Sequence, residues 1–140
     1  MFKIPVPKNE PVLSYAPGSK EKTSVKYALA DLRNKELDIA MIIDGQEVRT
    51  SDKHRIHPPH EIAHTLGYYY KGNITHVQNA IEAALRAKSS WENMAWQERA
   101  AIFLKAADLI AGKYRAQTNA MTMLGQSKNI YQAEIDAVCE

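Results

Sequence analysis

The second half of the chain carries apolar residues three or four positions apart over long stretches. This spacing is typical of one apolar helix face and predicts helices throughout residues 73–140. Asn73 is the expected N-cap of the first helix, Gly112 a left-handed residue that ends the second, and Gly125 the end of the third. The four apolar stripes comprise Ile74, Val77, Ile81, Ala84 and Leu85; Ile102, Phe103, Ala106, Leu109 and Ile110; Ala116, Ala120, Met121 and Leu124; and Tyr131, Ile135 and Val138.

The chain begins without a helix signal. Residues 1–18 contain four prolines, which forbid a continuous helix and predict an extended arm. Ser19 then offers an N-cap, and apolar residues at helical spacing predict one helix over residues 19–36, ended near Asn34 and Lys35. The prolines are Pro5, Pro7, Pro11 and Pro17, and the apolar face of the helix comprises Val25, Ala28, Leu29 and Leu32.

After this helix the apolar period changes to two. Alternating apolar residues predict one strand over residues 37–43, and Asp44-Gly45 is a strong tight-turn signal. Residues 46–50 would then be the returning strand, with Val48 pointing inward. The alternating residues are Leu37, Ile39, Met41 and Ile43.

A further strand is predicted before the helical half. Residues 51–59 should form a loop or an edge segment, because Pro58-Pro59 lacks two backbone donors, and residues 61–70 should form a strand. Residues 37–70 are thus expected to be a small antiparallel β unit. The predicted fold class is α+β: an arm, a helix, the β unit and a helical layer, all in one segment of 140 residues.

Composition excludes several classes of protein. With 45% hydrophobic residues and a net charge of +2, the chain is expected to fold, and it has no basic footprint for nucleic acid or for a membrane surface. No apolar run approaches the roughly 20 residues that cross a bilayer. One cysteine, Cys139, excludes an internal disulfide framework, and the opening residues lack a secretory signal, so a cytoplasmic location is expected.

One motif suggests zinc chemistry. His60-Glu61-Ile62-Ala63-His64 fits H-E-x-x-H, in which two histidines on one helix face bind zinc and the glutamate activates its water. The third histidine of one peptidase class would fall where Tyr70 stands, and Glu82 is an alternative third ligand. A small zinc peptidase using His60, Glu61 and His64 is therefore one hypothesis.

The surroundings of this motif favour a different interpretation. Pro58-Pro59 leaves His60 in the first turn of any helix, and the residues that follow fit a strand as well as a helix. On a strand the two histidines would lie about 13 Å apart, too far to share one ion. His54 and His57 complete a group of four histidines, for which we expect a loop-and-strand surface with, at most, adventitious nickel or zinc binding.

A set of segments spread along the chain carries a resemblance to a known family. They are Asn9-Glu10-Pro11, Pro17-Gly18-Ser19, Thr50-Ser51-Asp52, Ala80-Ile81-Glu82-Ala83-Ala84-Leu85, Trp91, Arg99 to Asp108, Met123 to Lys128 and Gln132 to Ala137. Through these segments nearly the whole chain resembles the N-terminal region of aldehyde dehydrogenases, and within that family the 1-pyrroline-5-carboxylate dehydrogenases. The resemblance is most specific between Ile102 and Asp136. A departure is His57-Pro58-Pro59-His60-Glu61, which stands where relatives have a short proline-containing stretch between strands.

The resemblance implies an NAD-dependent oxidation of L-glutamate γ-semialdehyde to L-glutamate in proline catabolism. A cysteine thiolate would add to the aldehyde, hydride would leave to NAD, and a water activated by glutamate would hydrolyse the thioester. It also implies a homo-oligomer, helices that pack against the cofactor-binding domain, and a mitochondrial location in a eukaryote. The family's nucleophile, base and cofactor loop would all lie beyond residue 140, so no catalytic, cofactor-binding or metal-binding residue is assigned here, and the chain alone should be inactive.

Other residues resemble functional groups without matching them. Ser127-Lys128 follows Gly125-Gln126 where the cysteine motif should stand, and Cys139 is interpreted as a small helix residue. Trp91 and Trp96 are expected to anchor helix packing, and a solvated face or ion pairs are expected for Arg99, Lys105 and Asp108. A non-catalytic helical interaction module is the remaining hypothesis.

Overall fold

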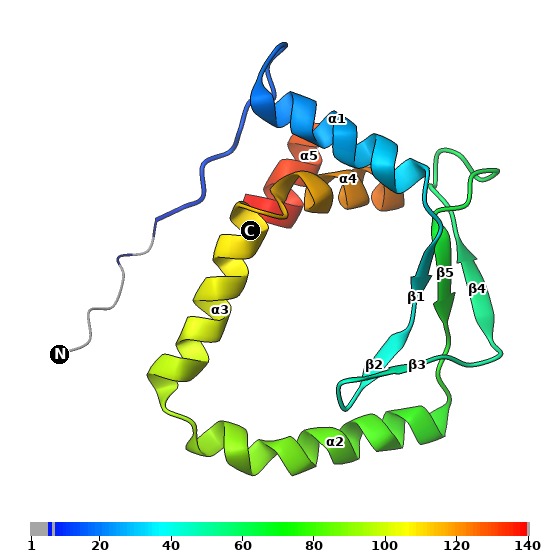
Figure 1. Cartoon of the computed structure of the whole chain (residues 1–140), viewed down its shortest axis with the longest axis vertical. Helices are drawn as coiled ribbons and strands as arrows, with labels where there is room; N and C mark the ends of the chain where they lie inside the picture. The colour runs from blue at the N-terminus through cyan, green and yellow to red at the C-terminus, as the bar shows by residue number, and fades with distance from the viewer. Residues whose placement is uncertain (1–5, 7, 140) are drawn as a thin grey trace.

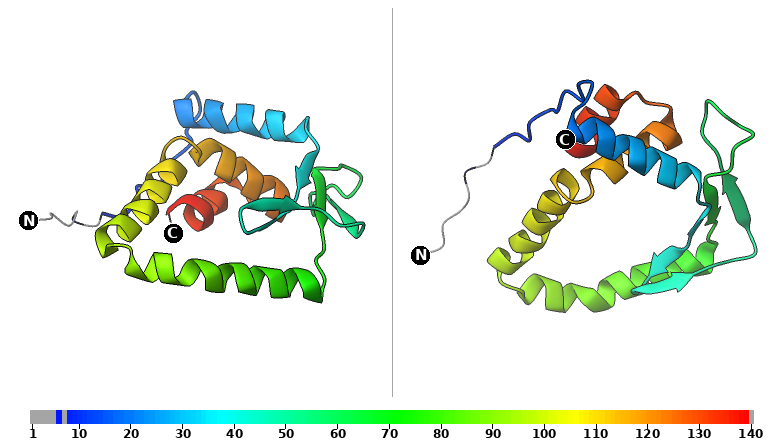
Figure 2. Two further views of the ribbon diagram at one scale, coloured as in Figure 1. Left: turned by 60° about the horizontal axis from the view of Figure 1, so that its bottom comes forward. Right: turned by 45° about the horizontal axis from the view of Figure 1, so that its top comes forward.

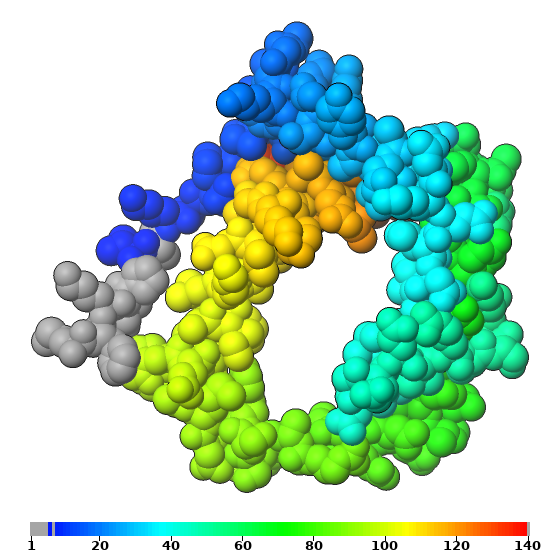
Figure 3. Space-filling model, viewed as in Figure 1, coloured from blue at the N-terminus to red at the C-terminus, as the bar shows by residue number. Residues whose placement is uncertain are grey.

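The computed structural model describes residue 6 and residues 8–139, so the expectations for Pro5, for Pro7 and for the last residue of the predicted helical range 73–140 lie outside it. The predicted α+β class is confirmed, and the elements form a ring with an opening at its centre (Figures 1 and 3). In chain order they are α1 (Lys20–Arg33), β1 (Leu37–Ile39), β2 (Met41–Ile43), β3 (Gln46–Val48), β4 (Lys53–Ile56), β5 (Gly67–Tyr70), α2 (Ile74–Asn93), α3 (Trp96–Ala111), α4 (Arg115–Gln126), α5 (Ile130–Glu134) and a π-helical turn (Ile135–Cys139).

Helix α1 begins and ends where its sequence signals predict. The Ser19 hydroxyl accepts a hydrogen bond from the backbone N–H of Lys22 at 3.2 Å, and Asn34 is the C-cap. Val25 and Leu32 are buried. The helix therefore packs its predicted apolar face on the rest of the chain.

The single strand predicted over residues 37–43 is wrong. The structure divides it at Ala40 into β1 and β2, which belong to different sheets. Alternation could not reveal the break, because each half keeps a period of two on its own. The Asp44-Gly45 turn is confirmed: both residues have positive φ, 53° and 73°, as the two-residue hairpin between β2 and β3 requires.

The β unit is mixed, which corrects the expected antiparallel arrangement. Its three-stranded sheet has the order β1-β5-β4, in which β1 and β5 run parallel, and β4 is the edge strand anticipated for residues 51–59. The long connection over residues 40–66 permits a parallel pairing that a short hairpin could not make. Gly67, with φ of 155°, lets β5 approach β1, since a Cβ there would lie 2.2 Å from the carbonyl oxygen of Leu37. Of the strand predicted over 61–70, Gly67–Tyr70 alone is a strand; turns and loop precede it.

In the helical half, Gly112 is confirmed as the end of α3 but not as a left-handed residue, and the expectation that Gly125 ends α4 is wrong. Gly112 has φ of −109° and is not left-handed; α3 ends there because the chain turns directly into α4, with the Tyr114 N–H bonded to the Leu109 carbonyl at 2.8 Å. Helix α4 passes through Gly125 and ends at Gln126, and its C-cap is Ser127, whose φ is 56°. The N-cap predicted at Asn73 is confirmed, and in the structure His76 completes a capping box with it.

The hydrophobic core lies at one corner of the ring, which comprises α1, α4, α5, the three-stranded sheet and residues 13–15 of the arm. Its buried members include Val25, Leu32, Leu66, Ala120 and Leu124. Helices α2 and α3 form an arc along the other side of the ring, and Figure 2 shows this arc from two more directions. The chain exposes 10266 Å², whereas a compact protein of 15.8 kDa would expose about 7,300 Å². The ring thus leaves about 3,000 Å² more surface open than a compact fold of this size.

Candidate functional site

The segment that carries the zinc-peptidase motif folds as turns. Backbone hydrogen bonds join the Glu61 N–H to the Pro58 carbonyl and the His64 N–H to the Glu61 carbonyl, each at 3.0 Å. His60 and His64 therefore do not share a helix face, the arrangement that H-E-x-x-H chemistry requires. Within residues 6 and 8–139, no group of three His, Cys, Asp or Glu side chains is placed to hold a metal ion, and Glu82 joins no such group.

The side chains of this motif make contacts that stabilise the fold. His60 Nδ1 lies 2.8 Å from the Ser127 hydroxyl, and this contact holds the motif against the left-handed end of α4. The Arg33 guanidinium pairs with Glu61 at 2.7 Å, and its hydrogen bond holds the pKa of that carboxyl below the ordinary value. The glutamate that would act as the general base is thus a half-buried partner in an ion pair.

The other two histidines of the group are held separately. His54 Nε2 lies 2.6 Å from an Asp52 carboxylate oxygen, and its ring lies 5.4 Å from that of Tyr69. His57 Nδ1 lies 3.1 Å from the Pro58 carbonyl oxygen. Adventitious nickel or zinc binding by the four histidines stays a prediction.

The most elaborate polar arrangement is buried at the corner of the ring, around Glu134. This carboxylate is fully buried, and it accepts hydrogen bonds from the Leu13 N–H at 2.9 Å, the Tyr15 hydroxyl at 2.7 Å and Asn119 Nδ2 at 2.7 Å. Arg115 forms an ion pair with it and donates from Nε at 3.1 Å. We call Tyr15, Arg115, Asn119 and Glu134 the polar hub.

Arg115 extends the polar hub into the N-terminal arm. Its guanidinium also forms an ion pair with Glu10 and donates to the Pro11 carbonyl oxygen at 2.8 Å. The arm around these residues has neither helix nor strand of its own. Side chains of α4 and α5 therefore hold residues 10–15 in place.

The electrostatics of the polar hub follow from its donors. Burial would raise the pKa of the Glu134 carboxyl, but the bonds from Arg115, the Leu13 N–H, Tyr15 and Asn119 outweigh it and hold this pKa below the ordinary value. Burial, with the neighbouring carboxylate, raises the pKa of Tyr15 to about 12. A carboxylate with this many donors is saturated, so the arrangement is suited to holding the arm and not to transferring protons.

Sequence reasoning missed the polar hub. Glu134 lies three residues after Tyr131 and four before Val138, on the stripe taken as apolar, and a charge at such a position is a signal for a buried partner. The partner, Arg115, is the first residue of α4. A search for opposite charges on facing helix stripes could have found the pair.

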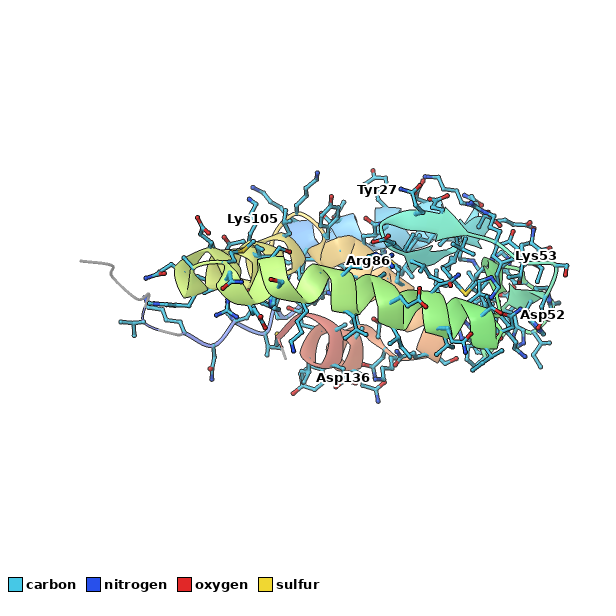
Figure 4. All side chains as sticks on the ribbon, turned by 90° about the horizontal axis from the view of Figure 1, so that it is seen from below. Tyr27, Asp52, Lys53, Arg86, Lys105 and Asp136 are labelled. Atoms are coloured by element: carbon cyan, nitrogen blue, oxygen red, sulfur yellow. The ribbon has the colours of Figure 1, made fainter. Side chains whose placement is uncertain are left out.

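The remaining residues singled out above lie apart from the polar hub. Cys139 is half-buried at the end of the π-helical turn, and Gly125-Gln126 forms the last turn of α4. Trp91 and Trp96 are 39% and 53% exposed, so they anchor less packing than expected. Lys105 and Asp108 are exposed as predicted, whereas Arg99 is half-buried; Figure 4 shows Lys105 at the molecular edge.

No described segment resembles a cradle for a dinucleotide. Helix α2 follows strand β5 closely, but Lys71-Gly72-Asn73 joins them without a glycine-rich loop. In the first turn of α2, the backbone N–H groups of Thr75 and His76 donate to the Asn73 side chain at 3.0 and 3.2 Å. The described residues therefore do not fit NAD. Separately, the described helices are not long and apolar enough to span a membrane.

Comparison with known proteins places this ring in a family. The model of the aldehyde dehydrogenase family matches residues 47–139, about two-thirds of the chain. The chain therefore belongs to the aldehyde dehydrogenase family.

Three relatives that are similar to the chain carry the name of one kind of aldehyde dehydrogenase. It is 51% identical over 140 residues to the delta-1-pyrroline-5-carboxylate dehydrogenase of Agaricus bisporus, covering 99% of this chain and 26% of that protein. A probable enzyme of the same name from Schizosaccharomyces pombe is 45% identical, with the same two coverages. The crystal structure of the Mycobacterium tuberculosis enzyme bound with NAD and cobalamin superposes with a TM-score of 0.97 at 45% identity, covering 100% of this chain and 26% of that one. The chain thus spans about a quarter of the length of these relatives.

Proposed function

We propose that this chain forms the N-terminal quarter of an NAD-dependent 1-pyrroline-5-carboxylate dehydrogenase, which oxidises L-glutamate γ-semialdehyde to L-glutamate in proline catabolism. The observation that carries the proposal is the match to the Mycobacterium tuberculosis enzyme over this entire chain, with a TM-score of 0.97 at 45% identity. A similar backbone at this identity implies the same role within the larger fold.

In this proposal the chain supplies scaffold and the rest of the polypeptide supplies chemistry. The residues that the structure describes do not fit NAD, and their buried carboxylate, Glu134, is saturated by donors. The nucleophile, the base and the nucleotide site would lie in the remaining three-quarters. We further expect the complete protein to be a homo-oligomer in the cytoplasm, or in the mitochondrial matrix, as the names of several eukaryotic relatives suggest for those proteins.

The test compares the 140-residue chain with the product of its extended reading frame. The extended protein should reduce NAD with L-glutamate γ-semialdehyde, and much more slowly with a simple aliphatic aldehyde that lacks the amino acid head group. The 140-residue chain should reduce none. Oxidation by the short chain, or an extended protein that prefers the aliphatic aldehyde, would contradict the proposal.

A further inference from the structure

The loop between β4 and β5 meets the end of α4 at a pair of side chains that the proposed function does not use. His60 Nδ1 lies 2.8 Å from the Ser127 hydroxyl oxygen, and both residues are exposed to solvent. When the imidazole proton is on Nε2, Nδ1 accepts the hydrogen bond that the serine hydroxyl donates. A serine hydroxyl within hydrogen-bond reach of a histidine is the arrangement that activates serine as a nucleophile.

The backbone of Ser127 has a conformation that serine seldom adopts. This residue is the C-cap of α4, with φ of 56° and ψ of 28°. Glycine is the usual residue at a left-handed helix end, because it adopts this conformation without steric cost. Backbone strain of this kind is concentrated at functional sites. What serine supplies here, and glycine could not, is the hydroxyl group beside His60.

A pocket with an apolar wall lies beside the pair. Its volume is about 350 Å³, and both His60 and Ser127 line it. Small-molecule sites in proteins start at about 300 Å³. Leu29, Met123 and Leu124 contribute the apolar part of the lining. The pocket is therefore suited to a small molecule that carries a short apolar chain.

Lys128 places a positive charge at the same pocket. It belongs to the pocket lining, and its ammonium group forms an ion pair with Asp136. When a hydroxyl attacks a carbonyl group, negative charge develops on the carbonyl oxygen, and a nearby cation stabilises that charge.

Glu61 places a negative charge next to the histidine. The pKa of its carboxyl is held below the ordinary value chiefly by the hydrogen bond from Arg33, and the charges of His64 and His60 lower it further. The carboxylate is therefore close enough to interact with the positive charge that His60 carries after it takes a proton.

We propose that Ser127, activated by His60, is a modification site that takes a short apolar acyl group from an acyl donor with a good leaving group. The donor binds with its acyl chain against Leu29 and Met123. This inference does not rest on the proposed function, because every group that it uses lies in the described part of this chain.

The reaction needs no further reactant. Ser127 Oγ attacks the carbonyl carbon of the donor, and the hydroxyl proton passes to His60 Nδ1. The bond between the carbonyl carbon and the leaving group then breaks, and the leaving group takes the proton from His60. The products are acylated Ser127 and the free alcohol or thiol, with no change in oxidation state.

The test uses p-nitrophenyl butyrate as the acyl donor. The protein is the 140-residue chain with Cys139→Ala, so that no thiol competes for the acyl group. We expect one equivalent of nitrophenolate per chain and a mass increase of one butyryl group, which peptide mapping places on Ser127. A butyryl group on lysine residues with Ser127 unmodified, or no modification at all, would overturn the proposal.

Three variants separate the reaction from the structural contact. Ser127→Gly removes the nucleophile and should fold, because glycine adopts the left-handed conformation without strain, and it should abolish the nitrophenolate release. His60→Asn keeps a hydrogen-bond acceptor near Ser127 but removes the base, and should slow the release at least tenfold. The control is Ser90→Ala, which removes an exposed hydroxyl that donates to the Ala87 carbonyl on α2, and should change nothing.

The melting temperature of each variant is the second readout. If the contact between His60 and Ser127 were structural alone, His60→Asn would change the melting temperature and leave the rate of acylation as in the parent chain. That result would overturn the proposal, and it remains decisive if Ser127→Gly does not fold.

Discussion

The corner of the ring buries the apolar faces of its helices, whereas the arc of α2 and α3 leaves its apolar faces largely exposed. At the corner, α1, α4, α5 and the arm bury both apolar residues and the ionised Glu134, and donors from this chain satisfy that carboxylate. Along the arc, α3 buries none of its residues and α2 buries Ala83 alone among those described. Amphipathic helices of one chain can therefore be packed, as at the corner, or exposed, as along the arc, according to whether the described residues supply a surface that covers their apolar faces.

The largest expected effect is at the centre of the corner. Glu134→Ala removes the acceptor of the polar hub and leaves Arg115 buried without its main partner, which should lower the free energy of unfolding by about 3–5 kcal/mol. Urea denaturation followed by circular dichroism measures this change. The matched control is Asp136→Ala, which breaks the exposed ion pair with Lys128 on the same helical segment and should cost under about 1 kcal/mol.

The same carboxylate should make the corner sensitive to acid. Because the folded-state pKa of Glu134 lies below its ordinary value of 4.5, its contribution is fully present above that pH and is lost as the pH falls through the folded-state pKa. The free energy of unfolding should therefore decline more steeply below pH 4.5 in the wild type than in Glu134→Gln. Parallel pH profiles for the two proteins would show that the carboxylate is not held as the structure describes.

A smaller effect is expected where the arm meets the polar hub. Tyr15→Phe removes the hydroxyl that donates to Glu134 and accepts from Asn119, and should cost about 1–3 kcal/mol. The Tyr15 contribution is fully present below pH 10, its ordinary pKa, and is lost as the pH rises towards about 12. The phenylalanine variant should lack this alkaline decline, and thermal unfolding over that pH range measures the difference. Tyr27→Phe, at an exposed position of α1, is the control and should change neither quantity.

The smallest effect on stability is expected along the arc. Leu85→Ser with Phe103→Ser replaces two largely exposed apolar side chains, so the free energy of unfolding should change by no more than about 0.5 kcal/mol for each substitution. The fluorescence of a hydrophobic dye bound to the chain should fall markedly, because exposed apolar patches are what such dyes bind. A loss of several kcal/mol would mean that these faces are buried and that the arc is not open.

Local signals predicted this fold well, and long-range partners explain what they missed. Ser19, Asn73 and Asp44-Gly45 determine their own caps and turn through neighbouring backbone groups, so their sequence was sufficient. The break at Ala40 and the parallel pairing of β1 with β5 depend on segments far along the chain, which periodicity cannot register.

The H-E-x-x-H segment and the polar hub show the same difference between local and long-range signals. H-E-x-x-H is a local pattern whose chemistry needs a helix, and in this chain it forms turns held by Arg33 and Ser127. The polar hub has no local pattern, because Glu134 takes its donors from α4 and from an arm that lies more than a hundred residues earlier. The resemblance to aldehyde dehydrogenases included Glu134, within Gln132 to Ala137, but it gave that residue no role and no partner.

Hydrogen exchange measured by mass spectrometry on the 140-residue chain tests the contrast between corner and arc most directly. Peptides from α1, α4 and α5 should exchange slowly, as parts of one cooperative unit, while peptides from α2 and α3 should exchange much faster because few tertiary contacts oppose their local opening. Uniform protection across all five helices would contradict the account, since it would mean that the arc is as fully packed as the corner.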